Sequence, residues 1–216
     1  MPSIIKEACV ENFEQALQAQ RLGADRVELC GSLNQDGLTP DLTELELCLN
    51  ELQIGTKVMI RHRPGDFCYD EDDQRRIFED LEKCQRLGAT KFVFGALTES
   101  KKLDIPLLRR FAGQLEAHED SGLTIHKAID DSIQPLEDLE ALKQIANVDS
   151  VLSSGQQPTA LQGAAMLHRM QAVCSDHFNL IAAGKITRGN LDEVHRTLNL
   201  REYHGRRIVQ PDTHSD

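Results

Sequence analysis

Two pairs of residues near the start of the chain could do chemistry, and each pair combines a carboxylate with a thiol. Glu7 and Cys9 are two positions apart, and so are Glu28 and Cys30. Side chains two positions apart lie on the same face of a β-strand, so each carboxylate would share a face with its thiol. If the two strands are neighbours, the pairs meet. Two carboxylates so close cannot both ionise cheaply, so one would act as an acid and the other as a base.

The same residues also have structural explanations. Glu7 or Glu28 alone could form an ion pair with a nearby arginine. Cys9 and Cys30 could be ligands for Cu(I), because soft thiolates select that ion, or small buried hydrophobic residues, since free cysteine is among the most buried residue types. The six cysteines include no C-x-x-C pair, so the sequence indicates neither a zinc knuckle nor a disulfide framework.

A second group of residues would suit an anion. Arg61 and Arg63 are also two positions apart, and two guanidinium groups in an acidic protein favour a phosphate or carboxylate ligand over solvated surface charges. Ser154, Gly155 and Gly184 follow β-rich segments, and small residues there bring backbone amides close to an anion. They could equally form tight turns.

A histidine completes the set of candidate catalytic residues. His126 ends a β-rich segment, and its reference pKa near neutrality suits general acid–base catalysis. Asp130, four residues on, is predicted to orient the imidazole. The alternative is a hydrogen-bonded core histidine. Lys127 follows His126 directly and is expected to point the other way, which argues against a Schiff-base lysine there.

These residues must be positioned by strands, and eight short β-rich segments alternate with seven amphipathic helical ones. The β-rich segments are Ile4–Ala8, Arg26–Leu29, Lys57–Ile60, Lys91–Phe94, Leu123–His126, Ser150–Leu152, Asn179–Ala182 and Glu202–His204. The helical segments are Asn12–Leu22, Leu42–Leu52, Asp72–Leu87, Ile105–Ala117, Pro135–Ala146, Ala160–Cys174 and Asn190–Leu198.

Strict alternation predicts a parallel sheet, and eight units predict its closure into a TIM (β/α)₈-type barrel, with an open doubly wound sheet as the alternative. Gly23 and Gly88 suit the left-handed position that ends a helix, and Asn12, Asp41 and Asp104 suit helix starts. In such a barrel the strand C-termini face a common mouth, where the candidate residues would meet.

The end of the chain predicts an incomplete outer ring. Only twelve residues follow His204, too few for an ordinary eighth helix. The uncovered apolar strand faces would favour a homodimer or higher homo-oligomer through the region where the last strand meets the first, around Ile4, Tyr203 and Ile208.

Composition excludes several classes of function. The 216 residues, expected to form one domain over 1–216, carry 35 acidic and 24 basic side chains, and the net charge of −11 repels nucleic acids and anionic membranes. No apolar run approaches a membrane span, and the first eleven residues lack the features of a signal peptide. We therefore expect a cytoplasmic protein with no nucleic-acid or membrane partner.

In order along the chain, these segments resemble the CutC family of copper homeostasis proteins. The most specific matches are residues 23–30 (GADRVELC), 36–40 (DGLTP) and 59–69 (MIRHRPGDFCY); others are 94–98, 124–130 and 152–155 with 160–163. The resemblance implies a cytoplasmic TIM barrel, a homo-oligomer and a role in copper handling with Cu(I) on Cys30, to which the residue pattern adds Cys9. The chain departs from the family pattern after the last strand, where Gly205-Arg206-Arg207 replaces a serine-containing turn, and it is shorter at the C-terminus.

The sequence leaves two functions open. One is cytosolic Cu(I) binding or handling at Cys9 and Cys30. The other is a metal-independent enzyme at the barrel mouth, with isomerase, lyase or hydrolase type acid–base chemistry on a small anionic metabolite. In that case Glu7, Glu28 and His126 would move protons while Arg61 and Arg63 bind the anion. Whether the protein is an enzyme is not decided by the sequence.

Overall fold

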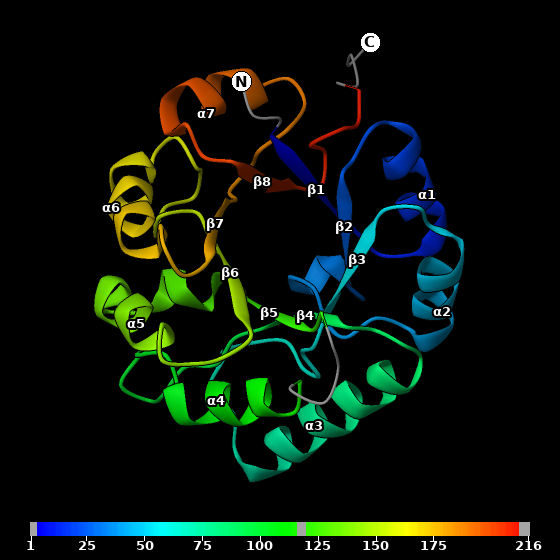
Figure 1. Cartoon of the computed structure of the whole chain (residues 1–216), viewed down its shortest axis with the longest axis vertical. Helices are drawn as coiled ribbons and strands as arrows, with labels where there is room; N and C mark the ends of the chain where they lie inside the picture. Colours follow the sequence, from blue (N-terminus) through cyan, green and yellow to red (C-terminus); the bar gives the residue numbers. More distant parts are fainter. Residues whose placement is uncertain (1–3, 116–119, 212–216) are drawn as a thin grey trace.

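The computed structural model describes residues 4–115 and 120–211, which form a closed barrel of eight parallel strands inside a ring of helices (Figure 1). The strands are β1 (Ile5–Val10), β2 (Arg26–Leu29), β3 (Gly55–Met59), β4 (Lys91–Phe94), β5 (Gly122–Ile125), β6 (Val148–Ser153), β7 (Asn179–Ala182) and β8 (Glu202–Gly205). Each pairs in parallel with the next, and β8 pairs with β1. The predicted TIM (β/α)₈ barrel is confirmed.

Within the described residues, seven α-helices alternate with the strands. They are α1 (Phe13–Arg21), α2 (Leu42–Glu51), α3 (Glu71–Arg86), α4 (Ile105–Gly113), α5 (Pro135–Leu142), α6 (Ala164–Cys174) and α7 (Leu191–Leu198), with short 3₁₀ turns η1 (Leu33–Gln35) and η2 (Lys127–Asp131). The end predicted for the fourth helix, Ala117, lies outside the described residues. None of the described helices has the length and apolar character that crossing a membrane requires.

The predicted helix boundaries have local causes. Asn12, Asp41 and Asp104 each accept a hydrogen bond from an amide in the first turn of the helix that follows, which satisfies a donor with no partner inside the helix. Gly23 and Gly88 follow α1 and α3 with φ of +87° and +95°, where a side chain would be strained. These turns return the chain to the start of β2 and β4.

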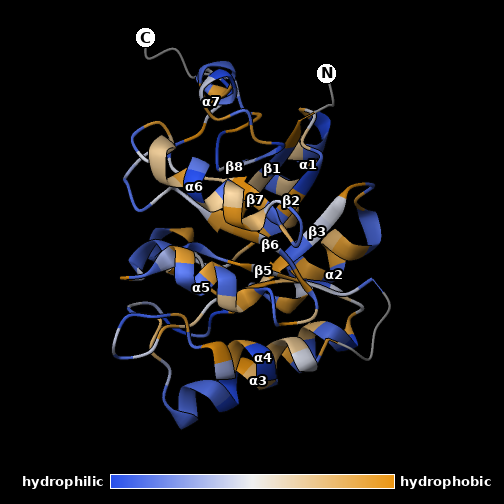
Figure 2. Cartoon of the chain, turned by 60° about the vertical axis from the view of Figure 1, so that its left-hand side comes forward, coloured by the Kyte–Doolittle hydropathy of each residue, from blue (hydrophilic) through white to orange (hydrophobic). Residues whose placement is uncertain are grey.

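The hydrophobic core lies between the barrel and its helices. Figure 2 shows hydrophobic residues on the strands and on the helix faces turned toward them, and hydrophilic residues outside. Val27, Leu29, Val58, Phe92 and Leu123 are completely buried on the strands. The barrel interior, by contrast, holds buried charges, so the core anchors the strands while their inward side chains remain available for chemistry.

Two strand ends differ from the prediction, with consequences for the site. β1 continues to Val10 rather than ending at Ala8, so Cys9 belongs to the strand and keeps the alternation with Glu7. β5 ends at Ile125, so His126 and Lys127 lie in the turn into η2. The alternation rule therefore fails for Lys127, and its side chain faces the mouth of the barrel.

The expected apolar surface between β8 and β1 is absent from the part of the chain that the structure describes, although no helix follows β8 there. Tyr203, Ile208 and Val209 are all buried, and the Tyr203 hydroxyl is hydrogen-bonded to the backbone of Leu200. The segment after β8 thus covers this seam within one chain. The reason given for an interface there is wrong, and self-association itself stays a prediction.

Candidate functional site

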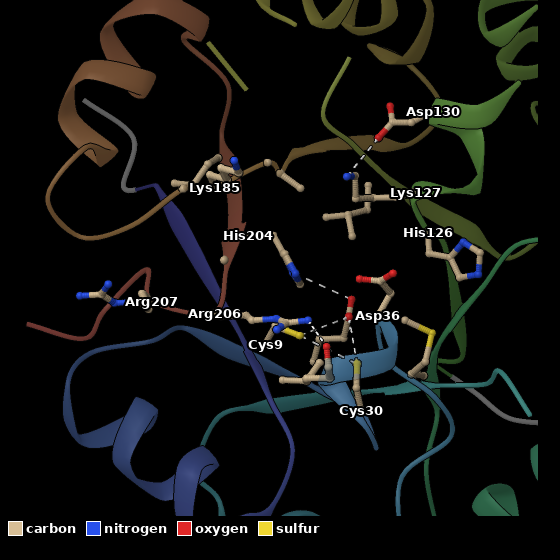
Figure 3. A pocket seen from close by; sticks show the side chains of 18 of the residues that line it. Cys9, Cys30, Asp36, His126, Lys127, Asp130, Lys185, His204, Arg206 and Arg207 are labelled. Carbon is tan, nitrogen blue, oxygen red and sulfur yellow. Dashed lines mark hydrogen bonds and ion pairs between the residues drawn. The ribbon is translucent and has the colours of Figure 1, made fainter. Parts of the chain in front are cut away.

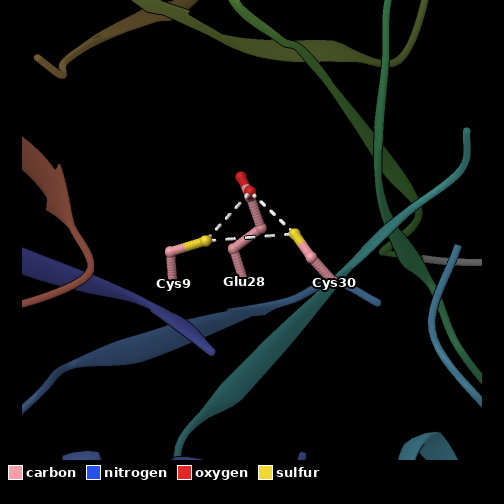
Figure 4. Close-up of side chains that lie close together, drawn as sticks. All are labelled: Cys9, Glu28 and Cys30. Carbon is pink, nitrogen blue, oxygen red and sulfur yellow. Dashed lines mark hydrogen bonds between the residues drawn. The ribbon is translucent and has the colours of Figure 1, made fainter. Parts of the chain in front are cut away.

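A cluster of two thiols and one carboxylate lies inside the barrel toward the C-terminal ends of β1 and β2 (Figure 4). The Cys9 and Cys30 sulfurs are 4.0 Å apart, and Glu28 Oε1 lies 3.9 Å from the first and 3.2 Å from the second. The register pairs Cys9 with Glu28, which explains why the two strands bring these side chains together. The strands therefore bring Cys9, Glu28 and Cys30 together as the alternation predicts, and Glu7 is the member of the two pairs that lies outside this cluster.

Glu7 lies one layer below this cluster and is completely buried. Its carboxylate accepts hydrogen bonds from Arg26 and from His204 Nδ1, the latter at 2.8 Å, and lies 3.3 Å from Lys57 Nζ. His204 Nδ1 is also 3.9 Å from Glu28 Oε2. His204 thus links the ion pairs at the base of the barrel to the thiol cluster.

The two carboxylates have pKa values on opposite sides of their ordinary value. Burial works to raise the pKa of Glu7, but Lys57, His204 and Arg26 together hold it well below that value. Burial raises the pKa of Glu28 to about 7, against the opposing effect of His204. Glu7 is therefore a permanent anion, while Glu28 is near the midpoint of its titration at neutral pH.

The two thiols also differ in acidity. The hydrogen bond from Cys30 lowers the pKa of Cys9 to about 5 against the effect of burial, with help from His204 and Arg206. The same hydrogen bond, together with burial, raises the pKa of Cys30 well above its usual value. His204 itself is held protonated, because Glu28, Cys9 and Glu7 raise its pKa despite burial. Cys9 is therefore the more acidic of the two thiols.

A pocket of about 760 Å³ opens above the cluster at the mouth of the barrel (Figure 3). Cys9, Glu28, Cys30 and His204 form part of its lining, and His126 lies on the side away from Cys9 and Arg206. Apolar, cationic and acidic side chains supply much of the rest: Leu33, Asp36, Met59, Arg61, Phe67, Lys127, Asp130, Asp131, Leu152, Lys185, Ile186, Arg206 and Arg207. The volume falls within the range typical of small-molecule sites.

His126 lines the pocket but differs from the predicted acid–base residue. Its Nδ1 accepts a hydrogen bond from the amide of Ala128, so the ring proton lies on Nε2. Burial and the nearby Arg61 charge lower its pKa to about 3, which keeps the imidazole neutral. Phe67 packs on the ring with 4.8 Å between centroids. His126 is thus a fixed neutral hydrogen-bond donor.

Asp130 does not orient His126, because its carboxylate is committed to the turn after β6. It accepts hydrogen bonds from the Ser153 and Ser154 hydroxyls and from the amides of Ser154 and Gln156. The amide of Gly155 donates to Ser153 Oγ. The predicted anion-binding role of Ser154 and Gly155 fails for the same reason, since their amides already have acceptors. Gly184, in contrast, does line the pocket.

Replacing Asp130 by alanine is expected to lower the free energy of unfolding by about 2–3 kcal/mol, because several buried donors lose a charged acceptor together. Urea denaturation would measure the change. Asp131→Ala is the matched control, since Asp131 is an exposed neighbour on the same turn. Equal stability of the two variants would contradict a positioning role for Asp130.

The two arginines serve different purposes. Arg61 lines the pocket, but its guanidinium donates to the carbonyls of Gln35, Gly37 and Gly65 and so holds two loops together. Arg63 lies outside the pocket, where it pairs with Asp66 and Asp73. β3 ends at Met59, so both arginines sit in a loop where alternation no longer applies. The prediction that both bind the anion is wrong for Arg63.

Other residues of the site were not singled out from the sequence. His204 follows from strand alternation, because it faces the same interior as Glu202, two positions before it. Lys185 and Arg206 come directly after Gly184 and Gly205, at the mouth ends of β7 and β8. The sequence feature that identifies Lys185 and Arg206 is their position just after a strand, at the end of the barrel where the pocket opens.

The fold and the site together define a TIM-barrel protein with a buried two-thiol cluster beneath an open pocket. A family model supports a closer assignment: it is described as the CutC family, it matches residues 4–209, and the chain belongs to that family. A family protein CutC of Mesorhizobium japonicum is 36% identical over 198 residues, 92% of this chain and 75% of the relative. A family protein CutC of Histophilus somni is 34% identical over 92% of this chain and 80% of its own length.

A solved structure has the same fold. It is the putative copper homeostasis protein CutC of Streptococcus agalactiae, which superposes with a TM-score of 0.85 over 95% of this chain and 99% of that one. The two sequences are 24% identical, so this similarity concerns the fold.

Proposed function

We propose that this protein binds Cu(I) between Cys9 and Cys30 and takes part in copper handling in the cytosol. The observation that carries the proposal is the 4.0 Å separation of the two buried sulfurs. Two metal–sulfur bonds of about 2.3 Å each, the length in zinc thiolate sites, span up to about 4.6 Å. A Cu(I) ion with two thiolate ligands therefore needs little movement of either side chain.

The donor set suits this ion. Thiolates are the soft ligands that select Cu(I), and Glu28 Oε1 is close enough to both sulfurs to add a weaker third contact. Cys9, Glu28 and Cys30 each offer a ligand atom within 4.8 Å of the others. Cu(I) with two thiolates carries one net negative charge, which the neighbouring His204 and Arg206 would balance. Cations beside the site thus favour the complex rather than oppose it.

A competition titration would test this proposal under anaerobic, reducing conditions. A chromophoric Cu(I) chelator should lose one equivalent of copper to the wild-type protein. Replacing Cys9 and Cys30 together by serine should remove that transfer, because serine supplies no soft thiolate. Cys48→Ser/Cys174→Ser is the matched control, since both of those thiols are buried on helices away from the pocket. Undiminished copper transfer to the first double variant would contradict the proposal.

The size of the pocket favours a second candidate function, an enzyme with acid–base chemistry on a small anionic metabolite. A cavity of about 760 Å³ is far larger than an ion needs, and it falls within the range of small-molecule sites. Incubation of the metal-free protein with candidate anions in deuterated water, followed by NMR, would detect exchange of carbon-bound protons. The wild-type protein should catalyse such exchange, and its absence across the ligands that bind would contradict this second function.

A further inference from the structure

Two cations that are not copper ligands line the upper part of the pocket. Lys185 and Arg206 follow β7 and β8, the two strands whose loops often hold an anionic group in TIM barrels. Figure 3 shows both on the side of the pocket away from His126, with Arg206 beside Cys9 and Lys185 above it. Acidic residues, among them Asp36 and Asp130, also line the pocket, but they lie toward His126, away from Lys185 and Arg206. In a chain with a net charge of −11, two cations on one side of the mouth favour an anionic ligand there.

From this geometry we infer that the pocket binds a small organic anion whose phosphate or carboxylate group lies between Lys185 and Arg206, with its carbon skeleton on the apolar wall. This anion would be the ligand of the second candidate function. Its binding does not depend on that function, but the chemistry that would follow binding does. Copper binding at the floor of the pocket is a separate property.

The two cations are available for a ligand to different degrees. Lys185 is exposed, and its amine has no partner among the residues that the structure describes. Arg206 donates one N–H to the carbonyl of Leu33, which fixes the guanidinium over the pocket and leaves its other donors for a ligand. A planar guanidinium with several donors suits phosphate and carboxylate oxygens.

The turn at the end of β7 is packed tightly against the neighbouring loop. Gly184 has φ of +101°, and a side chain there would collide with Ser154 and the backbone of Ala160. Lys185 follows in the left-handed region, with φ of 56°. These two residues with positive φ turn the chain sharply at the end of β7, so that Gly184, Lys185 and Ile186 all line the pocket.

A second observation points to a polar ligand in the same pocket. His126 Nε2 carries the ring proton, is buried, and has no acceptor within the described ranges 4–115 and 120–211. A buried donor without an acceptor is costly, and a ligand oxygen would relieve that cost. The apolar lining of Met59, Leu152 and Ile186 suits the carbon skeleton between two polar ends.

Isothermal titration calorimetry on the metal-free protein would test the inference. The probes are glycerol 3-phosphate, glutarate, glycerol and inorganic phosphate. We expect binding of the phosphate ester or the dicarboxylate, whichever oxyanion the site prefers, and none of glycerol. Failure of both organic anions to bind at 10 mM, or binding of inorganic phosphate alone, would overturn the inference.

Variants assign the binding to the two cations. Lys185→Asn removes the charge with a residue that tolerates positive φ, and Arg206→Gln removes the guanidinium. Each should weaken binding about tenfold, the loss expected for one hydrogen bond to a charged group. Arg188→Gln, an exposed charge after β7 that does not line the pocket, is the control. An equal loss in the control, or no loss in either variant, would overturn the assignment.

The same variants separate this inference from the copper proposal. Lys185→Asn should transfer Cu(I) from the chelator as the wild type does, because Lys185 contacts neither thiol. Cys9→Ser/Cys30→Ser should still bind the organic anion. Loss of anion binding in the cysteine variant would overturn the placement of the anionic group at Lys185 and Arg206.

Discussion

Replacing Glu7 by glutamine is expected to lower the free energy of unfolding by about 3–5 kcal/mol, the usual cost of removing one partner from a buried ion pair. Glu7 is completely buried and meets the charges of Arg26, Lys57 and His204. A neutral amide would leave these cations in a low-dielectric interior with too little negative charge. A lower midpoint of urea denaturation with an unchanged slope would show this loss.

The matched control is Glu82→Gln. Glu82 pairs with Arg86 on the exposed face of α3, four residues apart, where an ion pair contributes only about 0.3–0.5 kcal/mol. If Glu7→Gln is no more destabilising than Glu82→Gln, the ion pairs inside the barrel do not stabilise the fold as described.

Lowering the pH from 6.5 to 3 is expected to reduce the free energy of unfolding by about 4 kcal/mol through His126 alone. The pKa of His126 is lowered to about 3 in the folded protein, against 6.5 when unfolded. Between these values the unfolded chain binds the proton and the folded chain does not, so stability falls as the pH falls. Arg61 is the charge that opposes protonation together with burial.

Other groups titrate in the same range with different signs, so the measurement must compare variants. The pKa of Glu7 is lowered in the folded protein, so the stability that Glu7 contributes also falls as the pH falls. The pKa of Glu28 is raised to about 7, so below about pH 7 its protonation makes the folded protein more stable as the pH falls. Against His126→Asn, which keeps an acceptor for the Ala128 amide, these contributions cancel. The stability difference between wild type and variant should become less favourable to the wild type as pH falls. A constant difference would contradict the neutral, buried His126.

The strands and the thiol cluster were predictable from the sequence because both depend on local rules. Alternation along a strand placed Glu7 with Cys9 and Glu28 with Cys30, and the parallel register then brought the two pairs together. The neighbouring ion pairs were harder to foresee. Lys57 and His204 reach Glu7 from β3 and β8, which are 50 or more residues away in the sequence, and Arg26 reaches it from its register position on β2.

The loops account for most of the errors at the site. Arg63 and Lys127 were placed by alternation, which holds only inside a strand, and β3 and β5 end before them. Asp130 was assigned to His126 from sequence proximity, but it serves the turn after β6, whose donors lie more than twenty residues away. Turns are determined by such long-range hydrogen bonds, and the sequence pattern does not reveal them.

The most direct test of the central claim is X-ray absorption at the copper K-edge on the protein loaded with one equivalent of Cu(I). We predict a Cu(I) ion with two sulfur neighbours, and loss of both in Cys9→Ser/Cys30→Ser. A spectrum dominated by nitrogen or oxygen neighbours, or one that the double variant leaves unchanged, would contradict copper binding between Cys9 and Cys30.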